Sequence, residues 1–338
     1  MSSLITVPTN LSDDDPIPFR CDTDSYDVSV EMAKYIVQVA YLLVILILNI
    51  MILRCIFLTK RESYRANSFY LVYSTDLIVG AYMCISEILV GRLFIYVTPL
   101  CPILSPYFYT PSVLLKSYFT LLHYSTGFKT ISQVFLSFNR MTCVVFPLAY
   151  ESMWKRIWRW IILSMFLLPL GLIWNIVISR VYANPSSGGF SANYIKRVSW
   201  ASVSRLHLGY FIGSLLLIIV FTGATIYSLV VLKTRIKAAE RSITTASMVI
   251  SVEFLLLTLF QLYFAFFSST TSPLRPYLIR GLELTYDTLN FFPPIVMLYF
   301  NRQLRTDLGL RRRGDVVSVT ASRCALDILR IRQSPEHQ

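Results

Sequence analysis

Six charged residues lie inside long apolar stretches of this 338-residue chain: Asp76, Glu87, Lys129, Glu253, Glu283 and Asp287. A charged side chain in hydrocarbon is costly, so such residues pair with one another or mark a ligand or ion pathway. Five acidic groups and one lysine could form buried ion pairs, bind a polar ligand, or change their proton content between two helix packings.

The apolar stretches that carry these charges number seven. Each is about 20 residues long, which matches the roughly 30 Å hydrocarbon core of a bilayer. The chain is 55% hydrophobic and only 15% charged, whereas a soluble domain has about 25% charged residues. We therefore predict an all-α fold, a seven-transmembrane helix bundle with spans at 35–53, 67–91, 117–139, 160–179, 206–232, 245–267 and 281–301.

Positive charge alternates between the two ends of the predicted spans. Of the 31 Lys and Arg residues, 10 fall in one set of connecting segments, and 20 fall in segments 54–66, 140–159, 233–244 and 302–338. Basic residues mark cytoplasmic loops, so we predict that the amino terminus lies outside. This distribution argues against nucleic acid as the partner of the net charge of +12 and favours the lipid bilayer or an acidic cytoplasmic partner.

The predicted chain has three parts. Residues 1–34 form an extracellular tail, residues 35–301 the transmembrane domain, and residues 302–338 a cytoplasmic tail. In the last part, Leu304 and Leu308 share one helical face among basic residues, which suits a short amphipathic helix on the inner leaflet.

Five spans each place one polar residue at a similar depth. With a rise of ~1.5 Å per residue, these residues lie about 12–17 Å from the inner ends of their spans; they are Asn49, Asp76, Lys129, Glu253 and Asn290. We expect Lys129 to lie between Asp76 and Glu253, since a paired buried ion is far less costly than a lone one. The layer has two possible roles. Its role could be purely structural, fixing the helix register, or it could act as a switch.

A second polar set lies in the outer halves of the spans: Glu87, His123, Tyr124, His207, Tyr263, Glu283, Tyr286 and Asp287. Glu283 and Asp287 are four residues apart and share a helix face. An aromatic-rich cavity with a few polar groups is typical of small-molecule sites. We predict a ligand-binding pocket here, with ordinary helix contacts as the alternative for any single residue, and we predict no metal and no cofactor.

Two features lie outside the predicted spans. Cys21 and Cys101 both fall in segments predicted to be outside, where disulfides persist, so they could join the tail to the first outer loop. Asn10 begins the sequence Asn10-Leu11-Ser12, a candidate glycosylation site in the same tail.

The third span ends in the string NRMTCVVFPL, residues 139–148. This string resembles the inner end of span three in heptahelical G-protein-coupled receptors, above all in the nematode chemoreceptor family called serpentine receptor class gamma. The resemblance extends over nearly the whole chain in span count, spacing and loop lengths. It implies a chemosensory receptor in the plasma membrane of sensory neuron cilia, coupled to a heterotrimeric G protein.

Several positions also resemble the wider rhodopsin-like receptors. Asn49, Asp76 and Asn290 are similar to their polar triad. Lys129 lies eleven residues before Arg140, where those receptors often have a small polar residue beside a sodium ion. Our hypothesis is that the Lys129 ammonium stands in for that ion.

The inner face departs from the rhodopsin-like pattern. Arg140 resembles the arginine that contacts the G protein, but Asn139 replaces its usual acidic neighbour. Arg140 could instead pair with Glu240 in an inactive state, or it could be a plain inside-positive anchor. We count Asn139, Arg140 and Glu240 as G-protein-facing residues.

The leading interpretation is a chemosensory G-protein-coupled receptor that binds a small-molecule ligand in the outer half of the bundle. The alternative is a membrane transporter or channel that uses Asp76, Lys129 and Glu253. Many transporters have paired helices broken by Gly and Pro at matching positions, and no such pairing is visible here. We predict that the protein is not an enzyme, because the chain has no HExxH, GxSxG or paired catalytic Asp motif.

Overall fold

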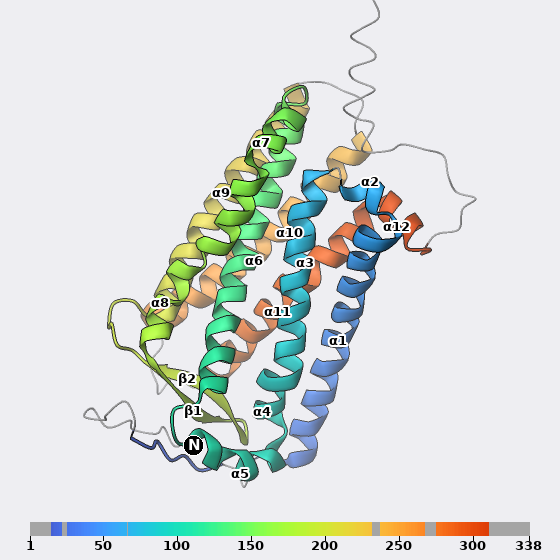
Figure 1. Ribbon diagram of the computed structural model, residues 1–338. Coiled ribbons are helices and arrows are strands. Elements are labelled where there is room, and N and C mark those ends of the chain that lie inside the picture. The colour runs from blue at the N-terminus through green and yellow to red at the C-terminus, as the bar shows by residue number, and fades with distance from the viewer. Residues whose placement is uncertain (1–14, 22–25, 66, 232–236, 268–274, 311–338) are drawn as a thin grey trace, which may run out of the picture.

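The structure is a computed structural model that describes residues 15–21, 26–65, 67–231, 237–267 and 275–310 (Figure 1). The candidate glycosylation site at Asn10 and most of the predicted cytoplasmic tail lie outside these residues. Segment 15–21 lies at one end of the molecule, called here the amino-terminal end (Figure 1).

Long helices run side by side through the molecule and confirm the predicted helix bundle (Figure 1). Seven segments of membrane length occur in the described chain: α1 (Val28–Arg54), α3 (Ser68–Ser86) with α4 (Arg92–Tyr96), α6 (Val113–Val145), α7 (Tyr150–Leu167) with α8 (Leu170–Ile178), α9 (Val203–Val231), α10 (Lys237–Leu262) and α11 (Arg275–Phe300). The connections contain α2 (Arg61–Arg65) and α5 (Cys101–Leu104), and α12 (Arg302–Asp307) follows α11. Single π-helical turns cover Cys55–Thr59, Glu87–Gly91 and Tyr263–Phe267, and 3₁₀ turns cover Thr98–Leu100 and Ser105–Phe108.

Five of the described helices are long and apolar enough to cross a membrane: Val28–Thr59, Ser68–Tyr96, Tyr150–Ile178, Val203–Ser228 and Val249–Phe267. The helices α6 and α11 have comparable length, with 33 and 26 residues, but they carry more polar side chains. Both have several helix neighbours: α6 packs against α3, α7, α8 and α9, and α11 packs against α1, α3 and α10. Their polar faces can therefore turn toward other helices.

Most helices extend beyond the predicted spans. The first begins at Val28, so the predicted boundary at residue 34 falls inside α1. Its start is set by Asp27, whose side chain accepts a hydrogen bond from the Ser29 N–H at 2.8 Å, a typical N-cap. The fourth span divides into α7 and α8 at Pro169, because a proline cannot donate the helical hydrogen bond.

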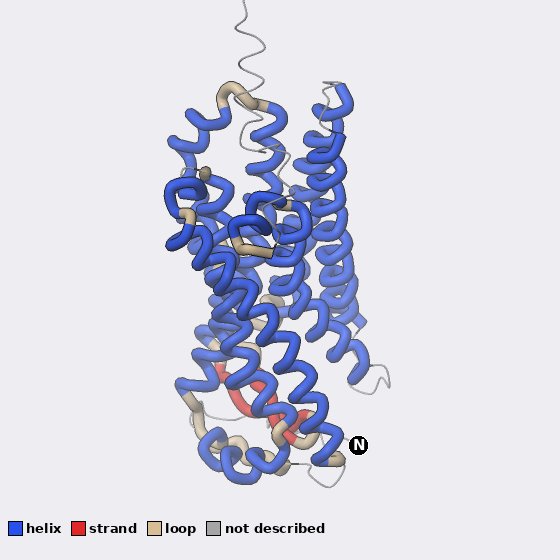
Figure 2. Tube along the Cα trace, turned by 90° about the vertical axis from the view of Figure 1, so that its right-hand side faces the viewer, coloured by secondary structure: helices blue, strands red, loops and turns tan. Residues whose placement is uncertain are grey.

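A β-hairpin lies across the amino-terminal end, where the sequence had predicted only a loop (Figure 2). Strand β1 (Arg180–Ser186) pairs antiparallel with β2 (Gly189–Ile195). Ser187 and Gly188 have φ values of 54° and 80°, as a two-residue hairpin turn requires. A Cβ on Gly189 would lie 2.1 Å from the Phe94 carbonyl oxygen, so only glycine fits where the hairpin meets the bundle.

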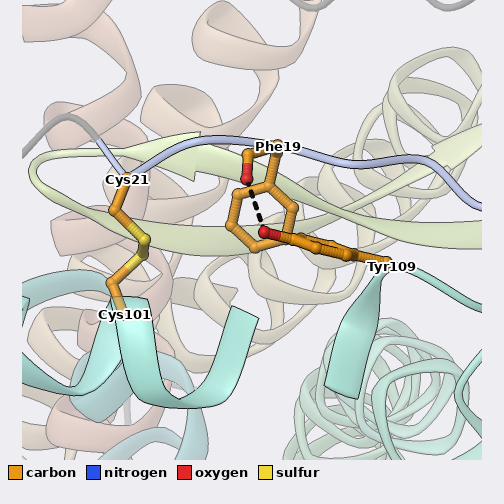
Figure 3. The surroundings of a disulfide bond; sticks show 4 residues. All are labelled: Phe19, Cys21, Cys101 and Tyr109. Carbon is orange, nitrogen blue, oxygen red and sulfur yellow. Dashed lines mark hydrogen bonds between the residues drawn. A yellow bond between two sulfur atoms is a disulfide. The ribbon is translucent and has the colours of Figure 1, made fainter. Parts of the chain in front are cut away.

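The amino-terminal segment 15–21 packs onto this hairpin. The Phe19 ring lies 5.5 Å from the rings of Tyr109 and Phe190, and the Tyr109 hydroxyl donates to the Phe19 carbonyl at 3.1 Å (Figure 3). Cys21 and Cys101 are joined by a disulfide with an S–S distance of 2.07 Å, across 80 positions of the sequence. The tail is thus tied to α5 and forms part of the cover over this end of the bundle.

At the other end of the bundle, α2 and α12 lie side by side near the ends of α1 and α3 (Figure 1). The Tyr64 hydroxyl donates to Asp307 at 2.7 Å, and burial followed by this hydrogen bond raises the Tyr64 pKa above its ordinary value. Leu304 is fully buried in the same cluster. The apolar face predicted to lie on the inner leaflet therefore packs into the protein.

We expect the disulfide to contribute measurably to stability. Replacing Cys21 by Ser releases the 80-residue loop and lowers the free energy of unfolding by about 2–5 kcal/mol. Thermal unfolding of the purified protein should then show a midpoint several degrees lower. Cys143→Ser changes an exposed cysteine far from the hairpin and is the matched control; equal midpoints for the two variants would contradict the role of the bond.

Candidate functional site

The centre of the bundle holds a buried ion pair between α3 and α6. Lys129 Nζ lies 3.1 Å from Asp76 Oδ2, and the two side chains are 1% and 0% exposed. Ser132 donates to the other carboxylate oxygen, and Gln133 Nε2 lies 3.4 Å from it. Asp76 therefore receives donors on both oxygens, which is what a carboxylate removed from water requires.

Three further members of the predicted layer surround this pair unequally. Gly80 shows the arrangement, because a Cβ there would lie 3.0 Å from Lys129 Nζ, 3.4 Å from Asn49 Nδ2 and 3.5 Å from Asn290 Oδ1. Glu253 is buried as well, but its Oε1 accepts from Thr288 at 3.0 Å.

The expected position of Lys129 between two carboxylates is therefore only half right. Among the ion pairs of the described residues, Lys129 contacts Asp76 and not Glu253. Glu253 comes from α10 and finds its hydrogen bond on α11, the helix beside it. The layer is an ion pair with two neighbouring amides, plus a carboxyl group that interacts electrostatically with Lys129 and Asp76 from beyond ion-pair distance.

A cavity of about 170 Å³ opens between this layer and the hairpin. Five of the eight residues predicted to bind a ligand line it, namely Glu87, His123, Glu283, Tyr286 and Asp287. Ser191 and Ala192 of β2 form part of its wall, and Asn290 lies at the cavity as well as beside Gly80. The cavity thus reaches from the cover of the bundle to the buried polar layer.

The other three residues of the predicted set are not among those that line the cavity. His207 is buried behind the wall, where its Nδ1 lies 3.0 Å from the Tyr286 hydroxyl. The Tyr124 hydroxyl donates to the Phe166 carbonyl at 2.9 Å, on the side of α7. Tyr263 lies in the π-helical turn after α10 and stacks edge-on against Phe264. These contacts correspond to the alternative of ordinary helix packing.

Arg92 is the main residue of this site that the sequence did not indicate. It is 4% exposed, and its guanidinium lies 3.0 Å from Glu87, 3.1 Å from Glu283 and 3.1 Å from Asp287. Tyr41 donates a hydrogen bond to Asp287. Three carboxylates that would each be costly alone thus share one cation.

The local helix geometry explains why Arg92 was missed. Charge counting assigned it to an outer connection, five residues after Glu87, a spacing that places two side chains on different sides of an α-helix. The π-helical turn Glu87–Gly91 instead lets the Arg92 N–H bond to the Glu87 carbonyl, five residues back. That turn brings the two side chains together, and π turns often mark functional sites.

Arg280 extends the charged cluster toward the hairpin. Its guanidinium lies 3.0 Å from Glu283 Oε2 and also donates to Tyr96 and to Ser187 at the hairpin turn. The hairpin is therefore connected to α11 by a side chain that also contacts the cavity wall. Among the described residues, no group of three or more His, Cys, Asp and Glu side chains is arranged to hold a metal ion.

At the other end of the bundle, Asn139 and Arg140 have different surroundings. Asn139 is buried, donates to Ser68 at 3.3 Å and accepts from the Tyr150 hydroxyl at 3.2 Å. The Arg140 guanidinium lies 5.7 Å from the centre of the Phe69 ring, a cation–π contact. Glu240 belongs to α10, but its side chain is outside the described part of the structure, so the proposed pair with Arg140 stays a hypothesis.

A bundle of membrane-length helices with a covered cavity at one end and an arginine at the far end of α6 is the architecture of a heptahelical receptor. Residues 35–308 match the model of the Srg family chemoreceptors. The chain is 59% identical to serpentine receptor class gamma-13 of Caenorhabditis elegans over 94% of each chain. It is 47% identical to serpentine receptor class gamma-10 of the same organism, over 91% of this chain and 94% of the relative.

The chain therefore belongs to the Srg family of chemoreceptors. Membership confirms the predicted family and the seven-transmembrane bundle, and it makes the protein a multi-pass membrane protein of a receptor family rather than an enzyme family.

Breaking the central ion pair from one side should be more harmful than removing it. Lys129→Met leaves the Asp76 carboxylate buried without its cation, which costs about 3–5 kcal/mol. Adding Asp76→Asn to that variant should recover part of the loss, because no unpaired charge remains. Thermal unfolding and surface expression measure both effects.

Glu253 provides the control for this pair. It makes its hydrogen bond to Thr288, so Glu253→Gln combined with Lys129→Met should give little recovery. Strictly additive effects of Lys129→Met and Asp76→Asn would show that the two residues do not stabilise each other.

Proposed function

We propose that this protein is a chemosensory G-protein-coupled receptor whose small-molecule ligand binds in the cavity beneath the hairpin. The single observation that carries the proposal is the cavity itself, which joins aromatic and charged side chains in one enclosed space. Membership of a chemoreceptor family supports the same function.

Asn290 offers a route from the ligand to the rest of the bundle. It lies at the cavity and also beside Gly80 and Lys129, so one side chain adjoins both polar groups of the molecule. A ligand that contacts Asn290 in only one arrangement of α11 would favour that arrangement over the other. Of the two roles considered for the buried layer, fixing the helix register or acting as a switch, this favours the switch.

The far end of α6 is the proposed contact for a heterotrimeric G protein. Arg140 borders a small space between α3, α6, α10 and α11, lined by Phe69, Tyr73, Ile250 and Val296. Its cation–π contact with Phe69 holds the side chain without a carboxylate partner among the ion pairs of the described residues. A change in helix packing can release such a contact at lower cost than a buried ion pair.

We propose that the amino-terminal end faces the outside of the cell. The basic segments gather at the opposite end, as cytoplasmic segments do, and the disulfide lies at the amino-terminal end. Residues 1–27 then form the extracellular part with Asn10 as glycosylation site, and residues after 301 form the cytoplasmic part. Sensory neuron cilia are the proposed location, by analogy with chemosensory function.

Filling the cavity should abolish the response to a ligand. In cells that express the receptor, a panel of volatile and water-soluble odorants is screened for G-protein activation. Ala192→Phe places a large side chain at the cavity wall and should remove any response found, whereas Asn193→Phe points to the exposed face of the same strand and should not. Equal responses from both variants would place the ligand elsewhere.

Changing the far end should separate binding from signalling. Arg140→Ala should reduce G-protein activation at least tenfold with ligand binding unchanged, because the residue lies far from the cavity. Arg156→Ala, an exposed basic residue of α7, is the control and should signal normally. Transport of the odorant without G-protein activation would instead favour the transporter or channel alternative.

A further inference from the structure

The charged side chains at the cavity do not balance. Glu87, Glu283 and Asp287 line it together with a single cation, Arg92. Arg280 adds one more positive charge through Glu283, so the cluster carries one negative charge in excess when all three carboxylates are ionised. Because these groups lie in a bundle surrounded by hydrocarbon, the excess is screened little by water.

The cations already present are paired with carboxylates. Arg92 donates hydrogen bonds of 3.1 Å from Nη1 to Glu283 and from Nη2 to both oxygens of Asp287, and its Nε lies 3.0 Å from Glu87 as an ion pair without a hydrogen bond. An anionic ligand would have to compete with these carboxylates for the same guanidinium. A cationic ligand would meet the excess charge without breaking an existing pair.

A second, independent observation concerns polar atoms without partners. Asn290 is 2% exposed, and its Oδ1 has no hydrogen-bond partner among the described residues. His123 Nε2 is likewise buried without a partner, and both residues line the cavity. A buried acceptor left without a donor costs about 1–3 kcal/mol, and a ligand N–H would remove that cost.

The remaining wall suits a small organic cation. The rings of Tyr118, Phe119 and Tyr286 line the cavity, and aromatic faces attract ammonium groups. A cavity of 170 Å³ holds a molecule of modest size, since an apolar cavity of about 150 Å³ binds benzene.

We propose that the ligand of this receptor is a small amine, with its ammonium group near Glu283 and Asp287 and its apolar part against the aromatic rings. The inference rests on the proposed function of the cavity and narrows it to one chemical class. A site for an amine differs in its binding preference from a site for a carboxylate, a neutral alcohol or a metal ion.

Three probes of nearly equal size test the charge directly: 2-phenylethylamine, 2-phenylethanol and phenylacetate. Each is titrated against the full-length receptor purified in detergent, and the thermal unfolding midpoint is followed, because a ligand that binds the folded state raises it. The amine should bind at least tenfold more tightly than the alcohol, and phenylacetate should bind least. Ala192→Phe should remove the amine effect.

Glu283→Gln tests the source of the selectivity. Glu283 is the most exposed of the three carboxylates, with 26% of its side chain accessible, so this isosteric change is the one best tolerated by the fold. It should weaken the amine at least tenfold and leave the alcohol unchanged. Glu151→Gln removes an exposed acidic group at the far end of the bundle and should change neither.

The outcomes separate this inference from the proposed function. Tighter binding of the alcohol or of phenylacetate, or no binding of the amine, overturns the amine class. An odorant response that Ala192→Phe removes, given only by neutral or anionic compounds, also overturns it while the receptor function stands. Amine binding without G-protein activation supports the ligand class and counts against signalling.

Discussion

A charged side chain inside a bilayer cannot be hydrated by bulk water. The ionisable groups buried in these helices must therefore interact with other groups of the bundle. Lys129 meets Asp76 between α6 and α3, and Arg92 meets carboxylates of its own π-helical turn and of α11. Where the partners come from different helices, as in Lys129–Asp76 and Arg92–Asp287, the pair also specifies which helices lie side by side. The helices α6 and α11, which carry several of these polar groups, accordingly each pack against several other helices of the bundle.

The same constraint shapes the cavity. The surrounding helices keep lipid away from the polar groups of the cavity, and the hairpin with segment 15–21 covers the cavity at the amino-terminal end. The close approach of Gly189 to the Phe94 carbonyl seats the hairpin, and the disulfide from Cys21 ties the segment over it. Arg280 then links the hairpin turn to α11, so the cover and the charged cluster are one connected structure.

The connection between the buried polar layer and the cavity depends on Gly80 and Asn290. Gly80 leaves just enough room for Lys129 Nζ and the two asparagines, because a Cβ there would lie 3.0 Å from the ammonium. Asn290 adjoins both this layer and the cavity. A ligand bound in the cavity, as proposed above, would reach the buried layer through this one residue. At the far end, Arg140 contacts an aromatic ring.

Local features of the sequence were enough to predict the helix bundle, the family and the approximate depth of most polar residues. These predictions rest on local properties: the length of the apolar stretches, the charge between them and the string at 139–148. Such properties can be recognised without knowing which segments come into contact. Residues such as Glu87, Glu283 and Asp287 were identified as a set because their positions along the spans place them in the outer half of the bundle.

Only the tertiary structure decided which of those groups meet. Glu253 and Asp76 lie at similar depths. Because of the way the helices pack, Asp76 forms an ion pair with Lys129, whereas Glu253 accepts a hydrogen bond from Thr288. Arg92 entered the cavity through a π-helical turn, and the hairpin formed where only a loop had been expected, because local spacing does not encode either event. Depth follows from position along one helix, whereas partnership depends on how the helices rotate and pack against one another.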